Sequence, residues 1–554
     1  MLLTVYQQFD AAARETPELA FLAYPPSTRR GYLADGAEFT YGAAGEKVEA
    51  LKAKYRDAGY LAGHRVGLLL GNRPEHFWHM LALNAIGASA VLLNPDYMPD
   101  ELAYGIEFAE CALVVAAPDR LAEAQQVAGG LELPLPVYDG SDLNASIPAP
   151  RRTPAATPAS PAEREALVIY TSGTTGRPKG CLISNLSCLA SGEYYATAGG
   201  LMTMERGCER LFLPFPTYHM NVSVFAFNAV TRLRNCLIMQ DRFHASTWWE
   251  DIAVTRATAF HYMGIVPPIL LKAPESPWEK RHTVKFGQGA GVDPNVRKAF
   301  EARFGFPLIE GWGMTETSRA IHNCQEPRCL EDRAFGRPRA PLEVRVVAED
   351  DTPLLCNTPG ELLVRASGPD PRWGFFSGYL KQPEETERAW RGGWFHTGDI
   401  VIQQDDGMLL FVERRKNIIR RSGENIAAAA VENALIEDAD ISSVAVIAVP
   451  DEFHDEEIMA CIVLAPGRTP SWDLAASIIE RSRAQLASHK LPAWVSFVDH
   501  IPVTGTQKVR KGMIFAENAD PRADGRSFDM RALKRKKSSG DVTTREIDRS
   551  VAGD

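Results

Sequence analysis

"YTSGTTGRPKG", residues Tyr170–Gly180, joins six consecutive Ser, Thr or Gly residues to a proline, two cations and a final glycine. It follows the apolar run "ALVIY", which predicts a buried strand. Closely spaced backbone N–H groups and short hydroxyls suit phosphate oxygens, and Lys179 adds a mobile positive charge. Because Arg177 and Pro178 separate Gly176 from Lys179, the string does not fit the P-loop pattern of ordinary NTPases. The stretch predicts a phosphate-binding loop, with a flexible Ser/Gly hairpin as the alternative.

The composition is that of a large globular protein. With 554 residues the chain is long enough for at least two domains, and its 45% hydrophobic share can fill a sizeable core. A net charge of -10 supplies no broad basic field for nucleic acid or for a membrane surface. The nine cysteines contain no C-x-x-C pair, and neither a signal segment nor an apolar run of membrane-spanning length is present. We therefore expect a cytoplasmic enzyme with reduced thiols.

The order of apolar runs predicts how the chain is organised. "RVGLLLGN" from Arg65, a helical segment and "AVLLNP" from Ala90 predict a βαβ unit with parallel strands. The Pro-rich and Ala-rich stretch 148–165 is typical of an exposed linker. From Ile418 onward, alternating helical and strand-like runs predict a small α+β module. After about Asp520 apolar residues become rare, which predicts a flexible, solvated tail that includes the basic run 534–537.

Four further strings accompany the opening stretch: "GWGMTETS" (Gly311–Ser318), "GGWFHTGDI" (Gly392–Ile400), "FVERRKNIIRRSGENI" (Phe411–Ile426) and "IPVTGTQKVRKG" (Ile501–Gly512). As a set, these strings resemble the signatures of the adenylate-forming (AMP-binding) superfamily, which includes acyl-CoA synthetases, peptide-synthetase adenylation domains and firefly-type luciferases. In motif style they are most similar to bacterial crotonobetaine/carnitine–CoA ligases. The resemblance runs from about Phe39 to Lys511, which is most of the chain.

The resemblance implies a fold and a reaction. The fold is α/β, with a large N-terminal domain (1–415) of parallel-rich sheets and helices, a small mobile C-terminal α+β domain (416–520) and a flexible tail (521–554). The reaction is that of an ATP-dependent acid:CoA ligase, which forms acyl-AMP with release of pyrophosphate and then acylates the CoA thiol. Two alternatives stay open: an adenylation enzyme that loads a carrier protein, and a non-catalytic nucleotide-binding homologue. The oligomeric state also stays open, a homodimer included.

The resemblance also assigns roles to side chains of the motifs. Trp312, where tyrosine is more usual, would offer a flat face to adenine, Thr315 a hydroxyl to phosphate, and Glu316 a hard oxygen to Mg2+. Asp399 would accept hydrogen bonds from the ribose hydroxyls. Lys508 would be the catalytic lysine, although Gln507 replaces the usual glycine before it. The remaining nucleotide-binding and CoA-binding positions are Thr171, Ser172, Gly173, Thr174, Thr175, Gly176, Lys179, Gly289, Arg414, Gly423, Glu424 and Asn425.

The hinge and the acid pocket are implied in the same way. Lys416 would be the pivot between the domains, and Glu413 stands where many members have glycine or aspartate. The acyl pocket would lie beside the segments 213–225, 261–267 and 287–291, where His219 is either a gate or carboxylate contact or a structural residue. Arg319 would meet a second carboxylate if the substrate is a diacid, and a surface or structural pairing is the alternative. The sequence does not identify the acid.

Overall fold

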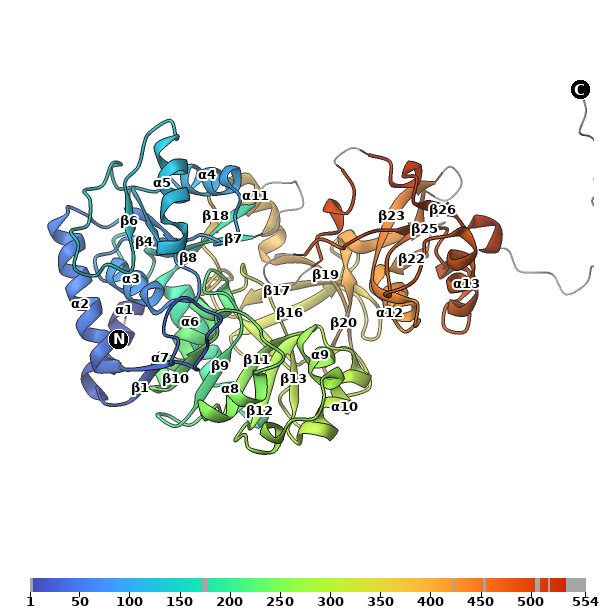
Figure 1. Cartoon of the computed structure of the whole chain (residues 1–554), viewed down its shortest axis with the longest axis horizontal. Coiled ribbons are helices and arrows are strands. Elements are labelled where there is room, and N and C mark those ends of the chain that lie inside the picture. The colour runs from blue at the N-terminus through green and yellow to red at the C-terminus, as the bar shows by residue number, and fades with distance from the viewer. Residues whose placement is uncertain are drawn as a thin grey trace, which may run out of the picture. The chain divides into compact units, whose positions relative to one another are not determined.

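The structure is a computed structural model that describes residues 3–171, 178–421, 424–451, 455–503, 509–516 and 519–534. These residues divide into two compact units, a large one that ends at Val412 and a small one that begins at Glu413 (Figure 1). The division falls close to the boundary that the sequence predicts between residues 415 and 416. Parallel-rich sheets in the large unit and an α+β small unit confirm the predicted fold class.

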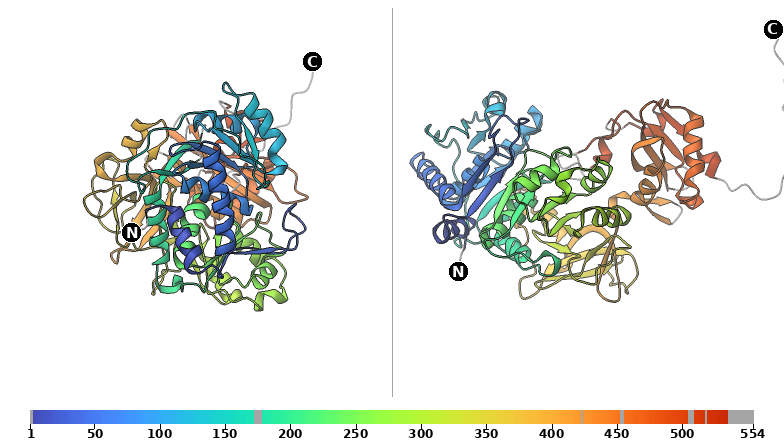
Figure 2. Two further views of the ribbon diagram at one scale, coloured as in Figure 1. Left: turned by 90° about the vertical axis from the view of Figure 1, so that its left-hand side faces the viewer. Right: turned by 60° about the horizontal axis from the view of Figure 1, so that its bottom comes forward.

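The first sheet of the large unit is mostly parallel. In the described residues its order is β14-β13-β12-β11-β9-β10-β1-β2, and only the edge strands β14 and β2 run antiparallel to their neighbours. Its strands in this order are Ala320–His322, Leu308–Gly313, Phe286–Ala290, Ala259–Met263, Arg210–Leu213, Cys236–Met239, Ala20–Tyr24 and Ala37–Thr40. Strand β1 therefore pairs with β10, which lies far along the chain, as the blue and green segments of Figure 2 show.

The second sheet contains the predicted βαβ unit. Its order in the described chain is β18-β8-β7-β4-β3-β5-β6, and β3 and β4 pair in parallel across α3 (Pro74–Ala85), which confirms that prediction. In the order given, the strands are Gly378–Tyr379, Lys179–Ser184, Glu165–Thr171, Ser89–Leu92, Arg65–Leu69, Leu113–Ala116 and Val137–Asp139. Pro74 begins α3, where its fixed φ suits the first turn and its missing N–H costs no hydrogen bond.

Helices cover both sheets on both faces. Successive residues of β9 face opposite sides: Leu211 belongs to the core between the sheets, and Phe212 packs with α8, α9 and α10 on the outer side. The middle layer contains α1, α2, α3, α6 and α7, while α4 and α5 cover the far face of the second sheet. The helices not yet given are α1 Val5–Glu15, α2 Tyr41–Asp57, α4 Pro99–Phe108, α5 Leu121–Gly129, α6 Asn185–Ala196, α7 Phe227–Leu233, α8 Trp248–Val254, α9 Val266–Lys272 and α10 Pro294–Phe304.

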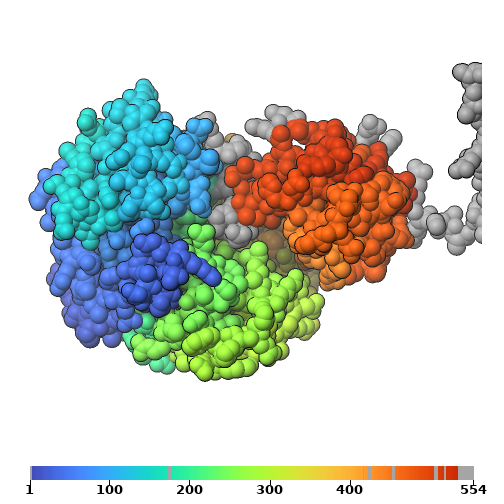
Figure 3. Space-filling view, viewed as in Figure 1, coloured from blue at the N-terminus to red at the C-terminus, as the bar shows by residue number. Residues whose placement is uncertain are grey.

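An antiparallel sheet completes the large unit. In the described residues its order is β15-β20-β19-β17-β16, and α11 (Pro383–Ala389) precedes β19 in the chain. The five strands in this order are Ala334–Gly336, Leu409–Arg414, Phe395–Gln403, Gly360–Ala366 and Leu342–Val347. In the space-filling view, the blue, cyan and green segments of the large unit form one continuous surface (Figure 3). Among the described helices, none combines the length and the hydrophobicity that a bilayer crossing requires.

The small unit is a sheet flanked by two helices, α12 (Ala428–Ile436) and α13 (Trp472–Ser482). Its strands are β21 Ile418–Arg421, β22 Glu424–Ala427, β23 Ile441–Asp451, β24 Asp455–Leu464, β25 Trp494–Phe497 and β26 Ser527–Asp529.

Residues 521–534, which the sequence analysis assigns to the flexible tail, are folded into this unit. Strand β26 pairs with β25, Met530 is fully buried, and the Lys534 ammonium lies 2.6 Å from the Glu457 carboxylate. One buried methionine and one buried ion pair anchor this polar segment, so its composition alone is misleading. Residues 535–554 lie outside the described chain.

Candidate active site

The strand β13 and the turn that follows it carry three of the predicted site residues. Trp312 lies near the carboxyl end of β13 and is 6% exposed, and Thr315 and Glu316 lie in the turn. The indole Nε1 of Trp312 donates a hydrogen bond of 2.8 Å to Oδ2 of Asp399 on β19. This bond joins the first sheet to the antiparallel sheet. It places the expected adenine-binding and ribose-binding side chains in direct contact.

Asp399 lies in an irregular part of β19. The register with β17 shifts between Glu361 and Leu363, so that Thr397, Gly398 and Asp399 form a β-bulge. Gly398 has φ +69°, and its N–H donates to the Glu361 carboxylate at 3.1 Å. The backbone N–H of Asp399 donates to the Thr397 hydroxyl at 3.1 Å. A bulge re-aims one side chain of a strand, which explains how the carboxylate of Asp399 reaches the indole.

Lys179 opens β8 and is the described cation of the opening motif. Strands β7 and β8 pair antiparallel, with Thr171 opposite Lys179. The Thr171 hydroxyl donates to the Lys179 carbonyl at 3.5 Å. The ammonium of Lys179 lies 3.0 Å from Oε2 of Glu385 on α11, and this contact lowers the pKa of the Glu385 carboxyl. The predicted phosphate-binding residues Ser172, Gly173, Thr174, Thr175 and Gly176 lie outside the described residues.

Tyr379 connects Lys179 to Glu316. The ammonium of Lys179 lies 4.9 Å from the centre of the Tyr379 ring, and the Tyr379 hydroxyl donates to Oε1 of Glu316 at 2.9 Å. Burial, and next the charge of Glu316, raises the pKa of Tyr379 far above its usual range, so the hydroxyl stays a donor. We call these three residues the Lys179–Tyr379–Glu316 cluster. It places the expected phosphate-binding cation beside the expected metal ligand.

Glu316 fits a Mg2+ site of the kind that nucleotide substrates complete. Mg2+ is commonly held by one or two carboxylates together with substrate phosphates and water. The structure agrees in one respect: the Glu316 carboxylate is held in place by the Tyr379 hydroxyl.

Gly289 lies where two strands approach closely. A Cβ at this position of β12 would be 2.2 Å from the carbonyl oxygen of Tyr262 on β11, so only glycine fits without a shift. The following loop is held by the buried carboxylate of Glu310, which accepts hydrogen bonds from the backbone N–H groups of Gly291 and Val292. Burial raises the pKa of Glu310 to about 7.

A buried chain of polar side chains runs from Tyr195 of α6 to two of the segments expected to line the acyl pocket. The Tyr195 hydroxyl and His261 Nε2 are 2.8 Å apart, and His261 Nδ1 lies 2.7 Å from Oδ1 of Asn221. Burial lowers the pKa of His261 to about 3, so its imidazole is neutral near pH 7. His219 accepts a hydrogen bond from the Asn221 N–H at 3.2 Å and stacks against Phe215. The gate role of His219 stays a prediction.

Arg319 is buried rather than at the surface. Its guanidinium lies between the rings of Trp373 and Phe375 and donates to the Trp373 carbonyl at 3.1 Å. Burial lowers its pKa to about 10. Gly374 leaves room for it, because a Cβ there would be 2.1 Å from Nη2. These contacts support a structural role, but the buried Nε and Nη1 of Arg319 have no hydrogen-bond partner among the residues that the structure describes, so the contact with a second substrate carboxylate stays a prediction.

The small unit carries the predicted hinge and CoA-side residues. Arg414 ends β20, and Lys416 lies in the 3-10 turn Arg415–Asn417, of which only the backbone is described at Lys416. Glu424 and Asn425 begin β22 and are likewise described by their backbone alone. Gly423 and Lys508 lie outside the described residues. Val503 and Val509 form an antiparallel bridge on either side of the segment that contains Lys508.

Glu413 has a structural role that the sequence does not reveal. Its carboxylate is buried and accepts hydrogen bonds of 2.9 Å from the N–H of Ala429 and 2.8 Å from the N–H of Arg414. Ala429 lies in the first turn of α12, where backbone N–H groups need acceptors and a negative charge is favourable. The departure from the family pattern at this position therefore fastens the connecting segment to the first helix of the small unit.

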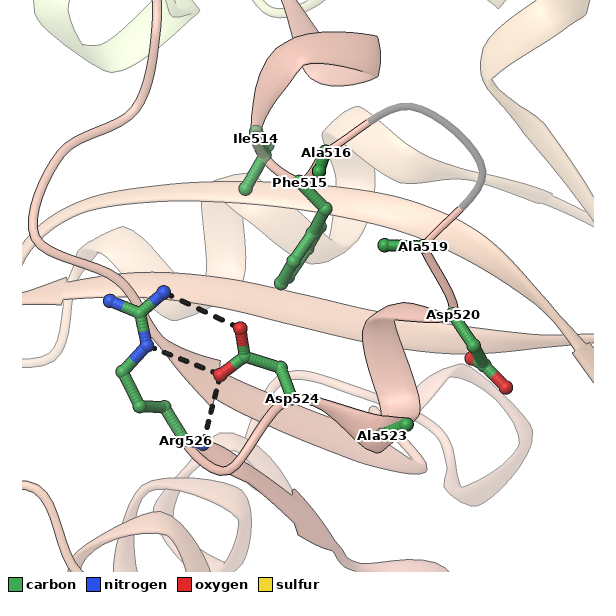
Figure 4. Close-up of a pocket in the computed structure, with 8 residues that line it drawn as sticks. All are labelled: Ile514, Phe515, Ala516, Ala519, Asp520, Ala523, Asp524 and Arg526. Carbon is green, nitrogen blue, oxygen red and sulfur yellow. Dashed lines mark hydrogen bonds and ion pairs between the residues drawn. The ribbon is translucent and has the colours of Figure 1, made fainter.

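A shallow cavity of about 360 Å³ lies in the small unit, around the ring of Phe515 (Figure 4). The Asp524 carboxylate at its edge is paired with Arg526, and Asp520 is paired with Arg522. None of the predicted site residues lines it. We therefore assign it no part in the chemistry.

Tyr379 and Glu385 are the functional candidates that sequence reasoning missed. Both lie within "SGYLKQPEE" (Ser377–Glu385), a stretch to which the sequence analysis assigns no role. Strand β18 pairs with β8, so that Tyr379 lies opposite Cys181, about two hundred residues earlier in the chain. Only the pairing of β18 with β8 brings these residues to the site, and the sequence does not indicate that pairing.

Comparisons with known proteins support the family that the sequence motifs predict. A family model described as AMP-binding enzyme matches residues 9–380, and one described as AMP-binding enzyme C-terminal domain matches residues 430–508. A sulfoacetate–CoA ligase of Cupriavidus necator is 29% identical over 508 residues, which cover 90% of this chain and 95% of that protein. A crotonobetaine/carnitine–CoA ligase of Salmonella paratyphi A is 27% identical over 487 residues, covering 86% of this chain and 92% of that protein.

Solved structures share the fold at lower identity. The o-succinylbenzoate–CoA synthetase MenE of Bacillus subtilis, in complex with an acyl-adenylate, superimposes with a TM-score of 0.77 at 20% identity, covering 93% of this chain and 98% of that one. ATP-bound MatB of Rhodopseudomonas palustris gives a TM-score of 0.75 at 23% identity, with 92% and 97% covered. Since the first family model spans well over half of the chain, this protein belongs to the AMP-binding enzyme family.

Proposed function

We propose that this protein is an AMP-forming acid–CoA ligase. In the first half-reaction a carboxylate oxygen attacks the α-phosphorus of ATP, the bond from that phosphorus to the bridging oxygen breaks, and pyrophosphate leaves. In the second, the CoA sulfur attacks the acyl carbon, the bond to AMP breaks, and the thiol proton passes to solvent. Two anions meet in the first step, so fixed positive charge and oriented donors should supply much of the acceleration.

The observation that carries the proposal is the arrangement around β13. Trp312 on this strand bonds to Asp399, the expected reader of ribose, and four residues later Glu316 bonds to Tyr379 beside Lys179. A nucleoside triphosphate has the same order of groups: base and ribose at one end, and phosphates with their metal at the other. The strand and its turn thus present matching groups to both ends of one ligand.

Each of these side chains has a task in the first half-reaction. Lys179 would exchange Glu385 for phosphate oxygens and follow the leaving pyrophosphate. Thr315 would donate its hydroxyl to a phosphate, and Glu316 would hold Mg2+. When bound, Mg2+ supplies positive charge that polarises the phosphate oxygens. The acid needs no general base, because carboxylic acids are ionised near pH 7.

The small unit would serve both half-reactions. Lys508 would stabilise the charge that accumulates at the α-phosphorus, as the motif resemblance implies. A backbone change at Lys416 would then replace this lysine by the loop with Gly423, Glu424 and Asn425, which would line the approach of the thiol. Hinges of this kind absorb a large rotation in a few residues.

We propose further that the acyl part of the substrate carries no second ionised group. The segments 213–225, 261–267 and 287–291 contain no Asp, Glu, Lys or Arg, and His261 is neutral. An unpaired charge buried against these groups would be costly. This distinguishes the expected substrate from sulfoacetate and crotonobetaine.

Acid-dependent exchange of labelled pyrophosphate into ATP, followed by AMP release with CoA, tests both proposals. The acids should include short-chain and aromatic monocarboxylates, a dicarboxylate, a betaine and a sulfonate. We expect exchange with uncharged acyl groups, thioester formation with CoA, and no exchange with Glu316→Gln. Thioester formation only on a phosphopantetheinylated carrier protein would instead identify a carrier-loading enzyme. Absence of exchange with every acid would overturn the ligase proposal, and a preference for the betaine or the sulfonate would overturn the substrate class alone.

A further inference from the structure

Tyr379 contacts both charged groups on the phosphate side of the candidate site. It lies on the edge strand β18, opposite Cys181 of β8. Lys179 lies two residues before Cys181, and residues two apart on a strand share one face. The Tyr379 ring therefore faces the ammonium of Lys179 at 4.9 Å, while its hydroxyl reaches Oε1 of Glu316 at 2.9 Å.

The two charged groups that share this tyrosine are not paired with each other. In the part of the chain that the structure describes, the ion-pair partner of Lys179 is Glu385, and Glu316 forms no ion pair with Lys179. A direct Lys179–Glu316 pair would neutralise the cation meant for phosphate and the carboxylate meant for the metal. An aromatic face attracts a cation but carries no net negative charge, so the cation keeps its positive charge for phosphate. A phenol hydroxyl that donates to a carboxylate fixes its orientation without placing a positive charge beside it.

We propose that Tyr379 is a positioning residue that keeps Glu316 oriented toward Mg2+ and Lys179 oriented toward phosphate, and prevents the two from pairing. The proposal rests on the proposed nucleotide-binding function, and it adds a residue that the motifs do not contain. Its two contacts are separable: the hydroxyl serves the metal ligand and the ring serves the cation. Partners of this kind, one step behind a metal ligand, commonly change metal affinity by about 10- to 100-fold when removed.

Calorimetry of ATP binding without acid, with Mn2+ or with EDTA, tests this without catalysis. Tyr379→Phe removes the hydroxyl and keeps the ring, so we expect ATP with Mn2+ to bind about tenfold more weakly and ATP in EDTA to bind within about twofold of the parent protein. Tyr379→Leu also removes the ring, so binding in EDTA should weaken about 2- to 30-fold, the range of a cation–π contact. Mn2+ titration by electron paramagnetic resonance in the presence of ATP gives the metal constant directly.

Tyr60→Phe is the matched control. Tyr60 is buried in the large unit, and its hydroxyl donates to a backbone carbonyl, that of Pro148, at 3.0 Å. Both Phe variants lose one hydrogen bond, so similar thermal shifts with a metal effect in Tyr379→Phe alone support the proposal. An unchanged Mn2+ constant in Tyr379→Phe, or equal weakening with Mn2+ and with EDTA, overturns it while parent-protein exchange still supports the ligase. No ATP binding by the parent protein overturns both.

Discussion

Replacing Glu385 by glutamine should tighten the binding of ATP. The Glu385 carboxylate lies 3.0 Å from the ammonium of Lys179 and also contacts Arg388. Phosphate must displace this carboxylate if Lys179 is to bind the nucleotide, so the ion pair opposes binding by its own free energy. Side-chain exposures of 18% for Lys179 and 35% for Glu385 make it a partly solvated pair. Such pairs contribute about 0.2–1 kcal/mol, which is about 1.4- to 5-fold in a dissociation constant.

The assay is calorimetry of ATP in EDTA, without acid, at low and at high salt. We expect Glu385→Gln to lower the dissociation constant by about 1.4- to 5-fold at low salt, and the gain to shrink at high salt as the charges are screened. Glu387→Gln is the control, because Glu387 lies on the same helix but pairs with Arg372 at 2.7 Å. Weaker ATP binding by Glu385→Gln would refute the reasoning, since the carboxylate would then orient the lysine rather than compete for it. An equal gain in ATP affinity in Glu387→Gln would show that the effect comes from the change in net charge and not from the ion pair with Lys179.

Two further predictions follow from buried groups. Trp312→Phe keeps an aromatic face but removes the donor to Asp399, and we expect calorimetry to show AMP binding about tenfold weaker or more, since a hydrogen bond to a charged group contributes about 1.5–3 kcal/mol; unchanged affinity would contradict this. Burial lowers the pKa to about 3 or about 4 in His76, His79, His261 and His322. Between about pH 4 and pH 6.5 these histidines take up protons only on unfolding, whereas Glu310, whose pKa burial raises to about 7, releases one. These five groups together take up about three protons on unfolding at pH 5.5, a contribution that makes the unfolding free energy of the large unit rise with pH by about 4 kcal/mol per unit; urea titrations that give a flat or falling profile would contradict it.

Local sequence patterns predict much of the fold, but they predict few of the contacts between segments that are distant in the chain. The β3–α3–β4 unit could be predicted because each element has its own periodicity and the pieces are adjacent in sequence. The packing of residues 521–534 could not, because one buried methionine, Met530, and the pair of Lys534 with Glu457 outweigh a polar composition. Those partners lie on strands that the segment meets only after folding.

The candidate site also contains residues that the sequence predicts and residues that it does not. Lys179, Glu316 and Asp399 could be predicted from sequence because the strings that contain them, taken as a set, resemble the signatures of one superfamily. Tyr379 and Glu385 could not, because their partner Lys179 lies about two hundred residues earlier and the contact exists only through the pairing of β18 with β8. The motifs contain the groups expected to contact the nucleotide, whereas Tyr379 and Glu385 reach those groups only in the assembled structure.

The hydrogen bond from Trp312 to Asp399 is a contact of this kind, and it has a chemical consequence for the site. An indole N–H can only donate, so its bond to Asp399 makes this buried carboxyl group the acceptor. A carboxylate has about four lone-pair sites, so one indole donor leaves acceptor capacity for a vicinal diol. A phenol hydroxyl at this position can accept as well as donate a hydrogen bond, so it would not fix Asp399 as the acceptor. The exchange of tyrosine for tryptophan therefore keeps the aromatic surface and also sets the direction of the hydrogen bond on which ribose recognition would depend.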